Sequence, residues 1–254
     1  MQVTQLVLKA VGGADTSLAV LAGIKPQLVT VFGAVSFFTD KAFQAALSAV
    51  LPDAAIIGCS TAGEISNGGV ADGTCVITAV NFSGTRIKSA TSPLRKMEDS
   101  QAAGARIGRE LAAPDLRALM VFGPGVQING SALVEGIAAQ ISANVPITGG
   151  LAGDGGAFTQ TWTLGSAGVS DNMLVAIGLY GDALDFAHGS FGGWEPFGPA
   201  RKVTRCAGNI LYELDGEAAL AVYKRYLGDH ANGLPASGLL FPFAMVGEDQ
   251  GARG

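Results

Sequence analysis

Short apolar runs alternate with amphipathic stretches from residue 27 onward. Gln27–Ala34 and Ala54–Ser60 are rich in β-branched and apolar residues, which predicts buried strands. Between them, Asp40–Leu51 repeats its apolar positions with helical spacing. Asp40 is expected to cap the N-terminus of this helix, and Pro52 marks its end. The pattern predicts a strand–helix–strand unit, which is typical of an α/β fold.

Two further strands and a helix are expected to complete this unit. Thr74–Phe82 and Arg86–Thr91 predict a pair of strands joined by a turn at Ser83-Gly84. Glu98–Leu111 has helical periodicity and ends shortly before Pro114. A hairpin next to a strand–helix–strand unit predicts a mixed sheet rather than a purely parallel one.

The same order of elements then recurs. The next run predicts a strand, a helix and two strands, at Arg117–Gly123, Gly130–Ser142, Val145–Gly149 and Met173–Tyr180. Asn129, directly before the helix, is expected either to cap it or to face a ligand crevice.

Matching words at a constant offset of 90 residues support an internal repeat. Val31-Phe32-Gly33 matches Val121-Phe122-Gly123, and Ala62-Gly63-Glu64 matches Ala152-Gly153-Asp154. Their fixed order favours a divergent duplication over chance recurrence. The fold class predicted is therefore α/β, with two duplicated strand–helix–strand halves, about 27–112 and 117–190, forming mixed sheets flanked by helices.

The pattern changes after Gly181. Three stretches predict strands and one predicts a helix, at Leu184–Phe191, Ala200–Cys206, Asn209–Leu214 and Gly216–Leu227.

Composition excludes several classes of protein. The 254 residues carry a formal net charge of −5, which argues against binding to a nucleic-acid backbone. No apolar stretch is long enough to cross a bilayer, so no membrane insertion is expected, and the N-terminus lacks the pattern of a signal peptide. Three widely spaced cysteines suggest reduced thiols and a cytoplasmic location.

Three sequence words together resemble the FIST family. They are IIGCSTAGEIS at Ile56–Ser66, PITGGLAGDG at Pro146–Gly155, and NILYELDGEAALAVYKRYLG at Asn209–Gly228. The resemblance implies a FIST N-terminal domain over residues 1–207. It also implies that residues 208–254 are the start of a truncated FIST C-terminal domain.

The resemblance implies a function in sensing rather than catalysis. FIST domains are sensory modules of intracellular signal transduction, with small ligands such as amino acids suggested. The expected partners are an amino-acid-like small molecule and a signalling protein. The resemblance brings no catalytic mechanism, and the chain lacks the spacing of a phosphate loop or a zinc site, so no cofactor and no metal are predicted.

The loop after the strand Ala54–Ser60 is the first part of the candidate ligand site. Ligands of open α/β sheets bind beyond the carboxyl ends of strands, where Cys59, Ser60 and Thr61 lie. The two hydroxyls offer hydrogen bonds, and the carboxylate of Glu64 offers a partner for an ammonium group. The alternative is that the glycines of this loop serve packing and turn geometry alone.

The corresponding loop of the second half is the second part of the site. Gly153 and Asp154 align with Gly63 and Glu64, so the two acids are expected to converge on one crevice if the halves face each other. The alternative is that Asp154 binds the N–H groups of its own loop.

Two other functions stay open at this point. Cys59 could act as the nucleophile of a transferase or hydrolase, with His188 as its base. Cysteine is more often a buried core residue, which argues against that role. The chain could also be an interaction scaffold that binds no small ligand.

Overall fold

The computed structural model describes residues 1–11, 14–189 and 194–245. The chain divides into two compact units, Met1–His188 and Gly189–Gly254.

The first unit contains a six-stranded sheet in the order β1-β6-β2-β3-β10-β11. Only β2 and β3 run parallel, and the other neighbours are antiparallel. The strands are β1 (Gln2–Leu8), β2 (Leu28–Gly33), β3 (Ala55–Ser60), β6 (Cys75–Asn81), β10 (Thr163–Gly165) and β11 (Gly168–Ser170).

A second, four-stranded sheet has the order β7-β12-β8-β9. Its β8 and β9 are parallel, and β12 is antiparallel to both β7 and β8. A separate two-stranded hairpin pairs β4 with β5. These strands are β7 (Arg86–Pro93), β8 (Leu116–Gly123), β9 (Ile147–Leu151), β12 (Met173–Tyr180), β4 (Glu64–Ser66) and β5 (Gly69–Ala71).

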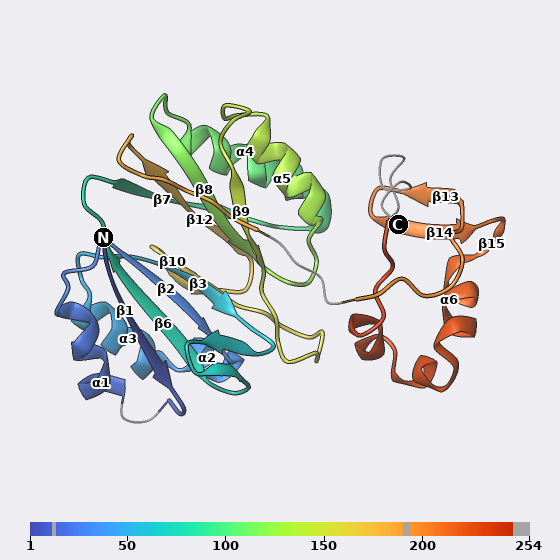
Figure 1. The fold of residues 1–254 in the computed structure, drawn as a ribbon, viewed down its shortest axis with the longest axis horizontal. Helices are drawn as coiled ribbons and strands as arrows, with labels where there is room; N and C mark the ends of the chain where they lie inside the picture. Colours follow the sequence, from blue (N-terminus) through green and yellow to red (C-terminus); the bar gives the residue numbers. More distant parts are fainter. Residues whose placement is uncertain (12–13, 190–193, 246–254) are drawn as a thin grey trace. The chain divides into compact units, whose positions relative to one another are not determined.

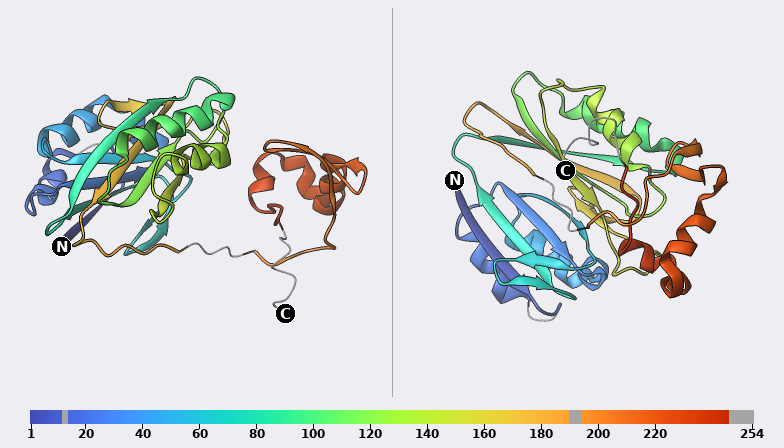
Figure 2. Two further views of the ribbon diagram at one scale, coloured as in Figure 1. Left: turned by 90° about the horizontal axis from the view of Figure 1, so that it is seen from above. Right: turned by 45° about the vertical axis from the view of Figure 1, so that its right-hand side comes forward.

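The two sheets face each other, and helices cover their outer faces (Figure 1). Buried side chains of both sheets meet in a central cluster, where the rings of Phe32 and Phe122 lie edge to face with centroids 5.2 Å apart. Two other clusters join each sheet to its own helices. The views in Figure 2 show the same layers from other directions. The central strands β2, β3, β6, β8 and β12 are covered on both faces, so they read as nearly continuous apolar runs.

Local sequence signals explain the helix boundaries. The Asp40 carboxylate accepts a hydrogen bond from Phe43 N at 2.8 Å, and the Asn129 side chain accepts one from Ala132 N at 3.1 Å. Both predicted N-caps are therefore confirmed. The helices of this unit are α1 (Ala14–Ala22), α2 (Val35–Thr39), α3 (Lys41–Val50), the 3-10 turn η1 (Met97–Asp99), α4 (Ser100–Leu111) and α5 (Gly130–Ala138).

The second unit is small. A three-stranded antiparallel sheet packs against one helix around Leu214, Ala219 and Val222. Its elements are β13 (Val203–Ala207), β14 (Ile210–Leu214), β15 (Glu217–Ala218), α6 (Ala219–Leu227), and the 3-10 turns η2 (Gly228–Gly233) and η3 (Ala236–Leu239).

The structure confirms the predicted mixed α/β class with helix-flanked sheets and corrects some elements. Residues 184–189 form no strand, so the strand predicted at Leu184–Phe191 is wrong over its described part, and Ser190 and Phe191 lie outside the described residues. The segment contains Gly189 and is exposed over residues 187–189, so neither ladder nor burial holds it extended. The pattern also missed β1, α1 and both short hairpins.

The duplication remains a prediction, but the two sheets share a strand order. The order β1-β6-β2-β3 has the same strand directions as β7-β12-β8-β9. In this comparison β1 corresponds to β7. The halves would then begin at Gln2 and Arg86, earlier than the boundaries read from the words of the sequence.

No helix among the described residues is long and apolar enough to cross a membrane.

Candidate functional site

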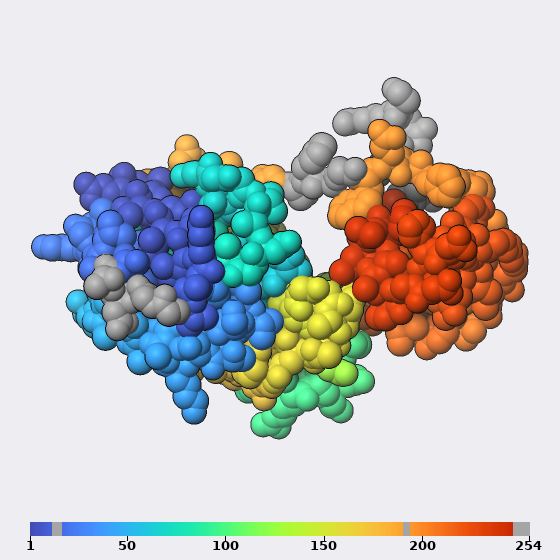
Figure 3. Space-filling view, turned by 90° about the horizontal axis from the view of Figure 1, so that it is seen from below, coloured from blue at the N-terminus to red at the C-terminus, as the bar shows by residue number. Residues whose placement is uncertain are grey.

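The two loops predicted to form one site are in contact. The Ser60 hydroxyl donates a hydrogen bond to the Gly153 carbonyl at 2.7 Å, and Gly153 N donates to the Ser60 carbonyl, also at 2.7 Å. In Figure 3 a yellow segment lies at the surface against the blue segments. The structure therefore brings Ser60 and Gly153 together at the end of β3.

The same serine holds a third segment in place. Ser60 is fully buried, and its hydroxyl oxygen accepts a hydrogen bond from Trp162 N at 2.9 Å. One hydroxyl thus links the end of β3, the loop after β9 and the segment that leads into β10. These two bonds use the hydroxyl's single donor and one of its acceptor positions within the protein.

Glu64 is also engaged inside the protein. Its side chain is buried, and Oε1 accepts from the Thr61 hydroxyl at 2.6 Å. Oε2 accepts from both the backbone N–H and the hydroxyl of Thr74, each at 2.9 Å. The carboxylate thus ties the start of the β4–β5 hairpin to the strand that follows it, and Thr61 is bound to the same group.

Asp154 binds its own loop. Its two carboxylate oxygens accept from the backbone N–H groups of Phe158, Thr159 and Gln160 at 3.0, 2.7 and 3.2 Å. Desolvation alone would raise the pKa of Asp154, but these hydrogen bonds outweigh it and hold the pKa below its usual range. The ionised carboxylate therefore fixes residues 158–160, as the local alternative in the sequence analysis describes.

Cys59 lies in the core between the sheets. Its side chain is 4% exposed, and burial raises the pKa of the thiol to about 12. His188 lies in an exposed, irregular segment at the end of the first unit. A thiol with this pKa is almost wholly protonated at neutral pH, which is the opposite of what a nucleophile needs.

This difference predicts a selective pattern of thiol modification. In the native protein at pH 8, Cys206 is expected to react readily with a disulfide reagent because it is exposed. Cys59 is expected to react about a thousandfold more slowly than an ordinary thiol, since its pKa is raised from 9.0 to about 12. Mass spectrometry of the modified peptides measures both rates. Fast modification of Cys59 in the folded protein would restore the nucleophile hypothesis.

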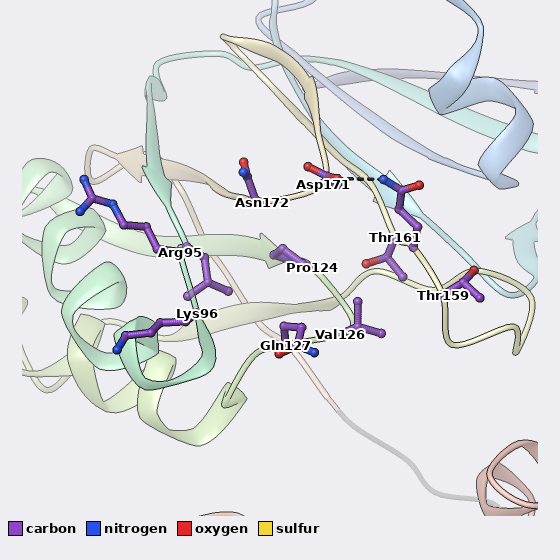
Figure 4. A pocket seen from close by; sticks show the side chains of 11 residues that line it. Arg95, Lys96, Pro124, Val126, Gln127, Thr159, Thr161, Asp171 and Asn172 are labelled. Carbon is purple, nitrogen blue, oxygen red and sulfur yellow. Dashed lines mark hydrogen bonds between the residues drawn. The ribbon is translucent and has the colours of Figure 1, made fainter.

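A pocket lies beside these loops, where strands of the second sheet end (Figure 4). It has a volume of about 470 Å³, which suits a small metabolite. Because β7 and β8 run in the same direction, the residues that follow these two strands lie at the same end of the sheet as the residues that precede the antiparallel β12. The lining residues are Leu94, Arg95, Lys96, Pro124, Val126, Gln127, Thr159, Gln160, Thr161, Asp171 and Asn172. This is the carboxyl-end position at which open α/β sheets bind ligands.

Polar groups of opposite charge line two sides of the pocket. In Figure 4 Arg95 and Lys96 lie on one side of the pocket, with their charged ends pointing away from the other lining residues, and Thr159, Thr161 and Asp171 lie on the other side. Both cations are exposed, and neither forms a salt bridge within the part of the chain that the structure describes. The two sides therefore carry opposite charges, and exposed side chains such as those of Arg95 and Lys96 change rotamer readily.

Hydrogen bonds fix the acidic side. Asp171 Oδ2 accepts from Gln160 Nε2 at 2.8 Å. The buried Thr161 hydroxyl accepts from Gly125 N at 2.8 Å, which joins the segment before β10 to the loop after β8. This wall is thus bound to both sheets, because Trp162 binds Ser60 next to it.

Two residues that line or adjoin the pocket have unusual backbone conformations. Gln127, which lines the pocket, has φ +60°, and Phe158, next to Thr159, has φ +54°. Side-chain-bearing residues seldom adopt positive φ, and such strain concentrates at functional sites.

None of the residues that line the pocket was among the site residues predicted from the sequence. Arg95 and Lys96 follow β7 in a segment without a motif, and Asp171 and Asn172 form the turn between two strands. The only available signal was their position after or before predicted strands of one sheet. Among the described residues, no group of three histidine, cysteine or acidic side chains is placed to hold a metal ion.

Comparison with known proteins identifies the family. The model of the FIST N domain matches residues 27–217, which is most of the chain. The chain therefore belongs to the FIST family, whose domain is a sensory and signal-transduction domain. The match passes the boundary between the two compact units at residue 188 and ends in β15.

One curated relative is similar over a shorter stretch. The uncharacterized protein MJ1623 of Methanocaldococcus jannaschii is 36% identical over 83 residues, which cover 33% of this chain. The stretch covers only 15% of the length of that relative.

Proposed function

We propose that this chain senses a small zwitterionic metabolite of the amino-acid type, which binds in the pocket at the ends of β7 and β8. The observation that supports the proposal is that Arg95, Lys96 and Asp171 line one pocket, and that neither cation has a salt bridge among the described residues. The exposed side chains of Arg95 and Lys96 turn toward the pocket when the ligand binds. A guanidinium binds a carboxylate through two parallel hydrogen bonds, and a carboxylate binds an ammonium group. Thr159 and Asn172 supply neutral hydrogen-bonding groups to the same ligand.

The six residues predicted from the sequence support this site in our proposal. Ser60, which is bonded to Gly153, and Asp154 bind the ends of the segment 158–162, whose residues Thr159, Gln160 and Thr161 line one wall of the pocket. The wall keeps its shape without a ligand because its anchors are hydrogen-bonded to protein groups. Next to Ser60 in the chain, Cys59 packs in the core between the sheets, and Thr61 donates a hydrogen bond to Glu64. Their contribution to binding is the positioning of the wall.

Signalling follows from the way the pocket joins two parts of the fold. Its acidic wall is bonded to the end of β3, whereas its cationic side follows β7 in the other sheet. A ligand that bridges both sides favours the conformations in which this distance fits, and a signalling partner reads that shift. The proposal involves no catalytic step, cofactor or nucleic acid. It places the protein in the cytoplasm, which three free cysteines support.

Ligand-induced stabilisation tests the proposal. A panel of the standard amino acids and their decarboxylated and deaminated analogues is added to the full chain, and Tm is measured. At ten times its Kd, a true ligand is expected to raise Tm by about 3–5 °C, because binding adds about 1.4 kcal/mol to the folded state. Analogues that lack either charge are expected to give a much smaller shift.

Two matched arginine variants make the result specific. Arg95→Gln is expected to weaken binding about tenfold or more, since it removes the bidentate cation. Arg109→Gln removes the same charge from an exposed position near the end of α4, outside the pocket, and is expected to bind normally. Equal losses in both variants, or no shift with any compound of the panel, would contradict the proposal.

A further inference from the structure

The strand β9 presents an open edge. It is the last strand of the second sheet and pairs only with β8 among the described strands. Leu119 N donates to the Pro146 carbonyl, and Ala152 N donates to the Gly123 carbonyl. Since the groups that face a neighbouring strand alternate along the chain, the N–H and C=O groups of Ile147, Gly149 and Leu151 point away from β8.

The strand β3 is the matching edge of the first sheet, and it is covered. There β10 pairs antiparallel, with Leu164 opposite Gly58 and Thr163 opposite Cys59. Ser60 N donates to the Trp162 carbonyl at 2.8 Å, and Leu164 is buried at 7% exposure. Main-chain bonds and one buried leucine therefore hold a strand on this edge.

The two edges correspond residue by residue. Gly58 lies opposite Val31 in its parallel ladder, and Gly149 lies opposite Val121 in the other. A Cβ atom at Gly58 would lie 1.9 Å from the Val31 carbonyl oxygen, and one at Gly149 would lie 1.8 Å from that of Val121. In this register, Leu151 of β9 takes the place that Ser60 has on β3.

β9 lacks the features that protect sheet edges. The opposite edge of its sheet, β7, carries Arg86 and Lys88 and ends at Pro93. Charged side chains and proline discourage the addition of a further strand. β9 reads Ile-Thr-Gly-Gly-Leu, and Leu151 is 45% exposed. An unprotected edge of this kind is a template for another chain.

We propose that β9 binds an extended segment of a partner protein, which pairs antiparallel in the register that β10 uses on β3. The main chain of the partner bonds to the outward groups of Gly149 and Leu151. A leucine-sized apolar residue of the partner lies opposite Gly149, as Leu164 lies opposite Gly58. This surface is separate from the proposed small-ligand function and does not depend on it.

A peptide copied from this chain provides the probe. The peptide of residues 160–171 contains β10, which occupies the matching edge, and β11, which pairs with β10. It is titrated into the isotope-labelled full chain, and amide signals and amide hydrogen exchange are followed. We expect saturable changes at Gly149 and Leu151 and slower exchange of both amides. A scrambled peptide is expected to leave them unchanged.

Two glycine-to-lysine variants complete the test. A side chain at Gly150 meets no atom within 4 Å, so Gly150→Lys is expected to fold and to weaken peptide binding about tenfold or more by placing a charge on the edge. Gly189 is equally open, and Gly189→Lys is expected to bind as the unmodified chain does.

Three results would overturn the proposal. The first is the absence of saturable changes at Gly149 and Leu151 at millimolar peptide. The second is an equal response to the scrambled sequence. The third is a chain that sediments as a dimer, does not bind the peptide and becomes a monomer with Gly150→Lys, since the occupant of β9 would then be a second copy.

Discussion

Replacement of Gly149 by alanine is expected to lower the free energy of unfolding of the first unit by about 4 kcal/mol. Gly149 has φ +142°, a conformation that other residues rarely adopt, and its Cβ would overlap the Val121 carbonyl oxygen at 1.8 Å. Backbone strain and overpacking each cost about 1–3 kcal/mol. The loss is large because the obstacle is backbone in the adjacent strand, which has to shift to relieve the overlap.

The neighbouring residue provides the matched control. A Cβ at Gly150 meets nothing within 4 Å, so Gly150→Ala is expected to change the free energy of unfolding by less than about 1 kcal/mol. Urea unfolding is followed by the fluorescence of Trp162 in a Trp194→Phe background, because the chain has two tryptophans and only Trp162 lies in the first unit. Similar midpoints for the two alanine variants would show that the contact with Val121 does not constrain this strand.

The long elements of the fold could be predicted because local signals specify them. Asp40 caps a helix through the N–H three residues later, and the apolar run Met173–Tyr180 forms a strand buried on both faces. The hairpin β10–β11 has strands of only three residues, which is too short for periodicity to be detected. Its pairing with β3 joins residues about a hundred positions apart, and no local preference encodes such a contact.

The contact between the two predicted loops could be anticipated in part, whereas the pocket lining could not. The contact of Ser60 with Gly153 follows from the idea that two similar loops meet, and the hydrogen bonds between them agree with it. Which groups Glu64 and Asp154 bind depends on where each acid lies relative to the strand that precedes its loop. At an offset of 90, Glu64 matches Asp154, but the ladders match Gly58 with Gly149, an offset of 91. The acids therefore occupy different positions in their loops.

Replacement of Glu64 by alanine is expected to destabilise the first unit by about 4 kcal/mol. The change removes an acceptor from three hydrogen bonds, one from Thr61 and two from Thr74. Hydrogen bonds to a charged group contribute about 1.5–3 kcal/mol each, and a buried donor left without a partner costs about 1–3 kcal/mol. Thr74 N is the donor most affected, because Thr74 is buried beside Glu64.

A glutamine at the same position separates a structural role from a ligand role. Glu64→Gln keeps an oxygen for Thr74 and presents an amide to the Thr61 hydroxyl, which can accept a hydrogen bond. It is therefore expected to recover a large part of the stability lost in Glu64→Ala, as measured by urea unfolding. If Glu64 positions the pocket wall, the glutamine variant should also retain ligand-induced stabilisation. A stable glutamine variant that no longer responds to the ligand would instead assign the ammonium contact to Glu64, since only the charge would then be missing.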